Sequence, residues 1–336
     1  MAARLARLVW ELGVIDRALL GLMSQKPVSG VALATHLGIS RSAVWKRIQH
    51  LRDSGFEIQT QSGQGYFLKH AIEWLDQNRI YDYLSNAAKK QLGDFHIAEQ
   101  IDSTNSWAKS ETKQKAGTDI FLAEQQTAGR GRLGRQWASP MAANIYLSLR
   151  RRFNKGLPAV SGLSLVVGVL LAKTLRSQGF TEVGLKWPND IVASGNKKCG
   201  GILIEVSGEA NAEIGVVIGI GLNVRMPAHS ALNIDQAWTD LQTQAGDRLL
   251  SRNEILVNLL NELLPGLQSF EDQGAAEFLS QWPNFDVLLN QDVKLLDGSR
   301  IHTGRVLGIT EQGALRLQQD RVERHYHSGE ISVRRL

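Results

Sequence analysis

The sequence predicts an α+β protein made of three domains, and three patterns along the chain indicate this. Helically spaced apolar residues followed by a hairpin occupy residues 1–69, strands and helices are mixed over 70–284, and short strands between tight turns fill 285–336. A chain of 336 residues also exceeds the length at which a single core usually stops growing. We therefore expect domain boundaries at 69/70 and 284/285.

The composition excludes several classes of protein. A single cysteine, Cys199, rules out an internal disulfide framework and a cysteine-based zinc site. His325 and His327 are the only closely spaced histidines in a strand-like context, where surface positions are commoner than ligands, so we expect no fixed structural metal site. No apolar run approaches the ~20 residues that span a bilayer, and Glu11 and Asp16 interrupt any secretory signal. We expect a cytoplasmic protein that does not contact membranes.

The charge is distributed unevenly along the chain. Residues 1–70 hold nine Lys or Arg and four Asp or Glu, which equals the net charge of +5 for the whole chain. A charge excess confined to one end indicates a module that binds a polyanion, attached to a neutral body. On charge alone, a solvated basic face is the better explanation of the excess.

The first domain has the spacing of a helix-turn-helix. A helical apolar stripe over 15–24 is followed by Ser29 as the N-cap of a helix over 31–37 that Gly38 ends, and Ser40 caps a third helix. A hairpin around the turn at 62–65 then completes a winged helix. The outward face of the third helix carries types that reach phosphates and base edges in the major groove, namely Arg41, Ser42, Trp45, Lys46 and Gln49. The alternative is a helical module for protein contacts, and the charge segregation favours DNA binding.

The second domain alternates strands with helices. Strands are expected over 119–126, 144–149, 183–187, 201–206 and 213–224. A long helix over 157–178 is apolar on several faces and should be central, and an amphipathic helix follows over 252–270. In the third domain, turns at 297–298, 311–313 and 328–329 separate short strands, which fits a small β-barrel of about five strands.

The loop Gly129-Arg130-Gly131-Arg132-Leu133-Gly134-Arg135 is the most unusual local feature of the second domain. It formally satisfies G-x-G-x-x-G, but a dinucleotide site needs a helix directly after the loop, and here a polar segment and a strand follow. Glycines allow close backbone approach to a ligand, and guanidinium groups bind carboxylate and phosphate bidentately. The loop therefore suits two anions that must be brought together, although an ordinary polar loop is the alternative.

Three further polar clusters stand at 102–105, 186–190 and 197–201. Each one alone is explained by a helix N-cap, a strand end or a solvated lysine pair. In order, however, the segments DSTN, AEQQTAGRGRLGRQW, NIYLSL, KWPND, KKCGGILIE, GIGLNV and GEISVR resemble the bacterial biotin protein ligases over about residues 15–336. With a winged helix in front, the chain is similar to the bifunctional kind, which also represses the biotin operon.

This resemblance implies an architecture and a reaction. The architecture is an N-terminal winged helix, a central mixed α/β catalytic domain of the biotin/lipoate ligase type, and an SH3-like C-terminal barrel. The reaction uses ATP and Mg²⁺ to convert biotin into biotinyl-5′-adenylate, which then biotinylates a lysine of the biotin carboxyl carrier protein of acetyl-CoA carboxylase. The resemblance also implies operator DNA as a partner and a homodimer when the adenylate is bound.

The resemblance also implies the site residues. Those for biotin are Ser103, Thr104, Asn105, Gln126, Arg130, Gly131, Arg132 and Lys198, of which Arg130, Arg132 and Lys198 are catalytic. Those for ATP and the adenylate are Gly129, Arg135, Asn189, Asp190, Asn223, Trp238 and Arg334, with Mg²⁺ near Asn189 and Asp190. Lys198 is preferred to Lys197 because it stands three residues before Gly201, as the family's Lys-x-x-Gly-Ile-Leu requires. Leu133 departs from the family, where a polar residue is common.

Three alternatives stay open at this point. A lipoate-type ligase shares the catalytic fold but should lack this form of the arginine loop and the winged helix. A pure ligand-sensing regulator should have lost the catalytic lysine or the loop arginines, which this chain retains. A ligase with an inactive winged helix is the third.

Overall fold

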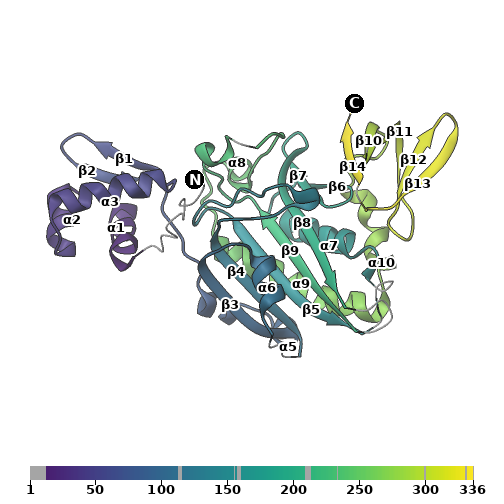
Figure 1. Ribbon diagram of the computed structural model, residues 1–336, viewed down its shortest axis with the longest axis horizontal. Coiled ribbons are helices and arrows are strands. Elements are labelled where there is room, and N and C mark those ends of the chain that lie inside the picture. The colour runs from purple at the N-terminus through teal and green to yellow at the C-terminus, as the bar shows by residue number, and fades with distance from the viewer. Residues whose placement is uncertain are drawn as a thin grey trace, which may run out of the picture.

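The computed structural model describes residues 13–112, 116–154, 156, 160–208, 213–232, 234–298, 300–329 and 331–335. A small module of helices and a hairpin lies at one end of the molecule, a seven-stranded sheet with helices forms the middle, and a five-stranded sheet lies at the other end (Figure 1). The predicted α+β fold is confirmed. Most of the N-terminal extension ahead of the first helix lies outside the described residues.

The N-terminal module is a helix-turn-helix with a wing, as predicted. Its elements are α1 (Val14–Gln25), α2 (Gly30–Leu37), α3 (Arg41–Asp53) and the antiparallel hairpin of β1 (Ile58–Gln61) and β2 (Gly65–Leu68). Ser29 and Ser40 cap α2 and α3 with their hydroxyls, and Gly38 ends α2 at φ 64°, a left-handed conformation that glycine adopts without strain. Val44, Ile48 and Leu51 are buried in a hydrophobic cluster that also contains α1 and wing residues.

The middle of the chain forms one mixed sheet in the order β3-β4-β5-β9-β8-β7-β6, in which only β3 and β4 run parallel. The strands are β3 (Leu92–Ile101), β4 (Thr118–Gln126), β5 (Ile145–Phe153), β6 (Gly184–Lys186), β7 (Asp190–Ala193), β8 (Lys197–Ser207) and β9 (Ile214–Leu222). The helices are α4 (Gln77–Asp82), α5 (Asn86–Gln91), α6 (Thr104–Ser110), α7 (Leu163–Ser177), α8 (Leu241–Ala245), α9 (Arg252–Gln273) and α10 (Ala276–Ser280). Short 3-10 turns lie at Arg132–Gly134, Ala228–Ala231 and Trp282–Asn284.

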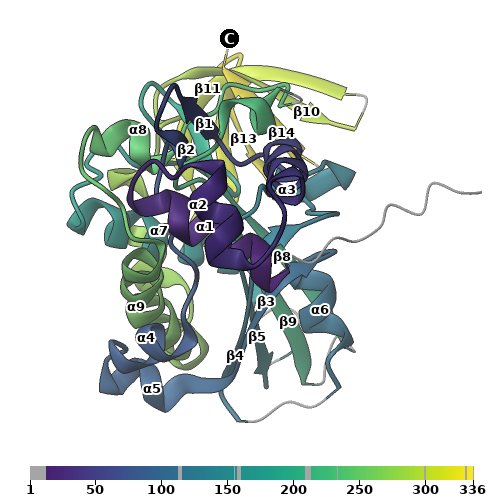
Figure 2. The same cartoon turned by 90° about the vertical axis from the view of Figure 1, so that its left-hand side faces the viewer.

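The two faces of this sheet are covered differently. Helices α7 and α9 pack on one face and on each other, whereas the short α6 covers the other face (Figures 1 and 2). Helix α7 is apolar almost all round and is buried over most of its length, so the prediction of a central helix is confirmed.

Several local predictions differ from the structure, and strand β7 is among the elements that were not predicted. Helix α7 begins at Leu163 rather than Leu157, since Gly162 at φ 77° breaks the helical path before it, and residues 157–159 lie outside the described ones. Strand β3 was not expected, because every one of its residues is only half-buried at the sheet edge and no alternation marks it. Strand β8 begins at Lys197 rather than Gly201. The strand continues through Gly200 and Gly201 because it is hydrogen-bonded to a neighbouring strand on each side.

The C-terminal part is an antiparallel sheet in the order β13-β12-β11-β10-β14. Its strands are β10 (Asp292–Asp297), β11 (Arg300–Ile309), β12 (Leu315–Gln319), β13 (Val322–Tyr326) and β14 (Ile331–Arg335). The five predicted strands are confirmed, and closure of the sheet into a barrel stays a prediction. Val293, Leu295 and Leu317 belong to the same buried cluster as the helices of the middle part, so these two parts share one core.

A polar and aromatic contact joins the winged helix to the middle part. Arg17 of α1 donates through Nε to Glu99 of β3 at 3.0 Å, and its guanidinium lies 4.6 Å from the Trp74 ring centroid.

Within the described ranges, no helix combines the length and apolarity that crossing a bilayer requires.

Candidate active site

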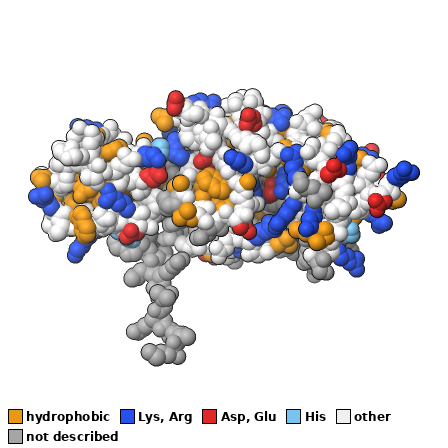
Figure 3. All heavy atoms as spheres, turned by 90° about the horizontal axis from the view of Figure 1, so that it is seen from above, with side chains coloured by type: hydrophobic (Ala, Val, Ile, Leu, Met, Phe, Trp, Pro, Cys, Tyr) orange, Lys and Arg blue, Asp and Glu red, His pale blue; other side chains and the backbone are white. Residues whose placement is uncertain are grey.

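A cavity of about 790 Å³ opens between the central sheet and β14. Seen from above, Lys and Arg side chains gather on the surface to the right of the centre of the molecule (Figure 3). Its wall combines the start of α6, the end of β4, the arginine loop, the β6–β7 turn, β8, β9 and β14. The predicted site residues that line it are Ser103, Thr104, Asn105, Gln126, Gly129, Arg130, Gly131, Arg132, Arg135, Asn189, Asp190, Lys198 and Arg334. The fold thus brings together segments that are up to 230 residues apart in the chain, from 103–105 to 331–334.

One end of the cavity is polar and uncharged. The backbone N–H of Thr104 donates to Gln126 Oε1 at 2.9 Å, and Gln126 Nε2 donates to Ser139 Oγ at 2.9 Å. Behind them, Ser148 Oγ lies 2.7 Å from Thr104 Oγ1 and 2.6 Å from Asn105 Oδ1. This chain of hydrogen bonds fixes donors and acceptors for a small polar ring.

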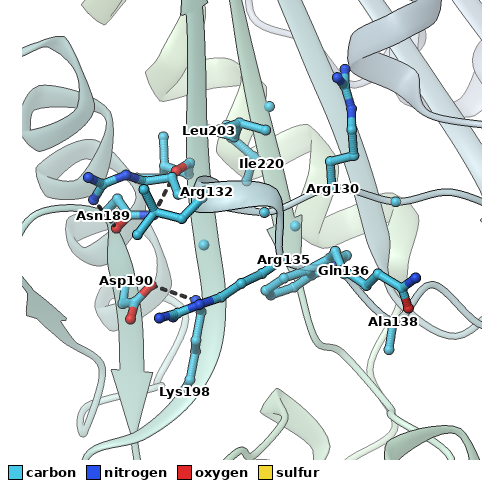
Figure 4. Close-up of a pocket in the computed structure, with 18 of the residues that line it drawn as sticks. Arg130, Arg132, Arg135, Gln136, Ala138, Asn189, Asp190, Lys198, Leu203 and Ile220 are labelled. Carbon is cyan, nitrogen blue, oxygen red and sulfur yellow. Dashed lines mark hydrogen bonds and ion pairs between the residues drawn. The ribbon is translucent and has the colours of Figure 1, made fainter. Parts of the chain in front are cut away.

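The other end of the cavity is cationic, and Lys198 is its best-defined member. Its Nζ lies 2.6 Å from Asp190 Oδ1 and 5.5 Å from the Trp137 ring centroid, with the side chain mostly buried (Figure 4). Lys197 is exposed and does not line the cavity. The geometry therefore favours Lys198 over Lys197, as the spacing to Gly201 predicted.

Lys186 also lines this end. No role was predicted for it, although it belongs to the polar cluster at 186–190. Burial lowers its pKa, and although Asp190 opposes this, the like charges of Lys198, Arg334 and Arg135 lower it further. Trp137 is a second cavity residue that the sequence did not predict. Its ring lies so close to Gly221 of β9 that a Cβ on that glycine would lie 2.5 Å from the indole. The glycine alternation in GIGLNV was the available signal for this close approach.

The three loop arginines point in different directions (Figure 4). Arg132 Nη1 donates to Asn189 Oδ1 at 3.0 Å, and its Nη2 donates to the carbonyls of Ser328 and Gly329 in the turn before β14. Burial lowers the pKa of the Arg132 guanidinium, which stays charged because an arginine pKa lies so far above neutrality. Arg132 therefore ties the loop to the C-terminal sheet.

Two predicted residues, Asn223 and Trp238, do not line the cavity. Asn223 is buried beyond the end of β9, where its Nδ2 donates to the carbonyl of Thr239 at 3.1 Å. Trp238 lies in a segment whose backbone pairs with Lys198, since Lys198 N–H donates to the Ala237 carbonyl at 3.0 Å. The backbone of both segments hydrogen-bonds to the start of β8, which carries Lys198.

The third helix of the winged module presents the predicted polar face. Arg41, Ser42, Trp45 and Lys46 are exposed, with Trp45 55% exposed, while Gln49 is half-buried. Arg52 of the same helix donates to the carbonyl of Ile58 at 3.0 Å and thereby fixes the wing relative to α3. An exposed aromatic ring between cationic side chains is suited to a nucleic-acid surface.

The fold and the cavity define a class of enzyme, and comparison with protein families agrees. The Biotin/lipoate A/B protein ligase family matches residues 97–223, an HTH domain matches 17–67, and the Biotin protein ligase C terminal domain matches 288–334. The biotin protein ligase from Aquifex aeolicus in complex with biotin and ATP superimposes with a TM-score of 0.62 at 28% identity, covering 72% of this chain and 99% of that one.

Relatives that match over nearly the full length narrow the assignment. The bifunctional ligase/repressors BirA of Salmonella typhimurium and Escherichia coli are each 40% identical over 306 residues, which is 91% of this chain and 93% and 92% of theirs. The chain therefore belongs to the biotin protein ligase family, as a ligase with a helix-turn-helix domain in front.

Proposed function

We propose that the cavity couples biotin to the α-phosphate of ATP and then passes the biotinyl group to a lysine of a biotin carboxyl carrier protein. A biotin carboxylate oxygen attacks the α-phosphorus, the bond to the β-phosphate breaks, and pyrophosphate leaves. The lysine amine then attacks the carbonyl of the mixed anhydride, loses a proton, and AMP leaves. The observation that carries this proposal is the union of an uncharged polar end and a cationic end in one cavity.

The polar end suits the ureido ring of biotin. Its donors and acceptors come from Ser103, Thr104, Asn105 and Gln126. They are held by hydrogen bonds within the protein before any ligand arrives, which lowers the cost of ordering them on binding.

The cationic end suits the reacting anions. Arg130, Gly131 and Arg132 would bracket the carboxylate and α-phosphate, and Lys198 would offset the charge that accumulates between them. Such preorganised charge lowers the barrier most where two anions must approach. Gly129, Arg135 and Arg334 would contact the adenylate and outer phosphates, and Lys186 adds a further cation there.

Mg²⁺ would enter with ATP. Asp190 and Asn189 offer one carboxylate and one amide oxygen at the cationic end, and such a small donor set suits an ion held mainly by phosphates and water. Among the described residues no group of three or more His, Cys, Asp or Glu side chains is placed to hold a metal ion. A role for Asn223 or Trp238 in adenine binding requires their segments to shift, since neither lines the cavity.

We also propose operator binding by the winged helix and repression by an adenylate-bound dimer. The exposed polar face of α3 supports the first, and the full-length similarity to the ligase/repressors supports the second. The buried residues of the N-terminal hydrophobic cluster run from Leu19 to Leu68, which supports a boundary near 69/70. The break between the turn at 282–284 and β10 supports a boundary near 284/285.

The test is ATP–pyrophosphate exchange with biotin or lipoate as the acid, followed by transfer to a biotin carboxyl carrier protein. Biotin-dependent exchange and labelling of the carrier are expected. Exchange with lipoate alone would make the chain a lipoate-type ligase, and no exchange with either acid alongside specific operator footprints would make it a pure regulator. Exchange without footprints would leave a ligase with an inactive winged helix.

A further inference from the structure

A charged cluster lies directly outside the cavity wall, on the strand that carries Lys198. Gly201 and Leu203 of β8 line the cavity, and Glu205 follows on the same face because side chains alternate along a strand. Glu205 is half-buried but does not line the cavity itself. It therefore lies next to the binding site rather than within it.

Glu205 collects three donors from two other segments. Its Oε1 accepts from Lys109 Nζ at 2.9 Å, and its Oε2 accepts from Asn105 Nδ2 at 2.8 Å and lies 3.3 Å from Arg130 Nη2. Burial raises the pKa of Glu205, but the hydrogen bonds from Lys109 and Asn105 and the charge of Arg130 outweigh it and keep the pKa below its usual range. Glu205 is therefore ionised at neutral pH.

Arg130 is turned toward this cluster rather than toward the reacting end of the cavity. Its guanidinium points away from Arg135 and from the Lys198–Asp190 pair (Figure 4), and it also donates to Ser106 Oγ at 3.2 Å. The side chain is 42% exposed and its contact with Glu205 is the longest of the three, so this contact is the cheapest to break. Lys109 contacts the other carboxylate oxygen, Oε1, so its pairing with Glu205 does not require Arg130.

We propose that Glu205 is a positioning residue that holds Arg130 at the side of the cavity until the carboxylate of the acid substrate replaces it. Lys109 neutralises Glu205 after the exchange and thereby sets how readily Arg130 is released. This inference rests on the proposed function, in which Arg130 contacts the biotin carboxylate.

The test measures binding of biotin and of biotinol, its alcohol analogue without a carboxylate, by titration calorimetry in the full-length protein. Glu205→Gln keeps an oxygen for Asn105 but removes the competing charge, so biotin should bind about two- to fivefold more tightly, the range expected for a partly exposed ion pair. Biotinol should bind equally well to both proteins, because it has no carboxylate to exchange.

Lys109→Met is the matched second variant, since it keeps the apolar stem and removes the charge that shares Glu205 with Arg130. It should weaken biotin binding by a similar factor, and this loss should vanish in the Glu205→Gln background, because no carboxylate remains to hold Arg130. Thermal unfolding of each variant checks that the fold is kept.

The outcomes separate the two proposals. Absence of biotin binding by the unmodified protein would overturn the proposed function. Biotin binding that is unchanged or weaker in Glu205→Gln, or equal changes for biotin and biotinol, would overturn the exchange proposal alone and leave Glu205 as a support for Asn105.

Discussion

Three cations of the site have partners within the protein. Lys198 pairs with Asp190, Arg132 with backbone carbonyls, and Arg130 with Glu205. Paired cations avoid the cost of leaving like charges unbalanced in a partly buried cavity. The choice of partner is a feature of individual residues and not of the fold.

Lys198→Ala should slow adenylate formation by ~10²-fold or more, since it removes a preorganised charge at the reacting atoms. Lys197→Ala should change the rate little, because Lys197 is exposed and outside the cavity. Single-turnover formation of biotinyl-adenylate measures both. If Lys197→Ala proved to be the slow variant, the assignment of the lysine would be wrong.

At the scale of elements, the start of α9 holds the segment that leads from the wing into the central sheet. Arg252 is 4% exposed, and its Nη1 lies 2.8 Å from Glu124 Oε2 of β4. The same guanidinium also donates to the backbone carbonyls of Asn144 and Glu73. One side chain thus joins helix α9, strand β4, the residue before β5 and the linker.

Arg252→Met should lower the free energy of unfolding by about 3–5 kcal/mol, because it leaves the buried Glu124 carboxylate without its positively charged partner. Arg305→Met is the control, since Arg305 pairs with Asp292 at the surface and its loss should leave stability nearly unchanged. Denaturant unfolding measures both variants. Equal losses in the two variants would show that burial does not determine how much each ion pair contributes to the free energy of unfolding.

The arginine loop is the second element whose behaviour can be tested. Glycines and like charges disfavour a packed state, so we expect trypsin to cut after Arg130 or Arg132 in the ligand-free protein and to cut more slowly with biotin and MgATP. Mass spectrometry identifies the cleavage sites, and lipoate with MgATP is the control. Cleavage at the same rate with and without biotin and MgATP would contradict ordering of the loop.

At the scale of the whole molecule, the described residues form two main buried clusters rather than three. The winged helix has its own, whereas the C-terminal sheet shares the core of the central part and is further tied to it by the hydrogen bond from Trp187 Nε1 to the Gly313 carbonyl at 3.1 Å. The DNA-binding module is thus the more independent unit, held to the rest partly through Arg17.

Biotin and MgATP together should convert monomers into dimers and strengthen binding to an operator-like palindrome. One winged helix makes few phosphate contacts, so specific binding needs two copies with fixed spacing. Adenylate that orders loops beside the site removes part of the entropy cost of association. By linkage, dimerisation should strengthen adenylate binding by the same factor by which the adenylate strengthens dimerisation. Sedimentation equilibrium and gel shifts test this. A monomer with adenylate bound, or DNA binding that ignores it, would restrict the chain to ligation.

The sequence by itself determined the helix-turn-helix, the wing, the five C-terminal strands and the central apolar helix, whereas the ligand-site residues came from the family resemblance. The elements follow from short-range signals, since caps at Ser29 and Ser40 and turns such as 297–298 act over a few residues. The segments around the arginine loop and Lys198 could be found because each carries an unusual local pattern.

Only the tertiary structure decided which residues face the cavity and which partner each charge takes. Strand β3 has no alternation to read, and the start of α7 depends on one left-handed glycine. Asn223 and Trp238 were predicted to bind the adenylate but do not line the cavity. Glu205 meets Arg130 across 75 residues of chain. Such contacts arise when strand register brings distant segments together, and the energies that select them depend on burial, which no local pattern encodes.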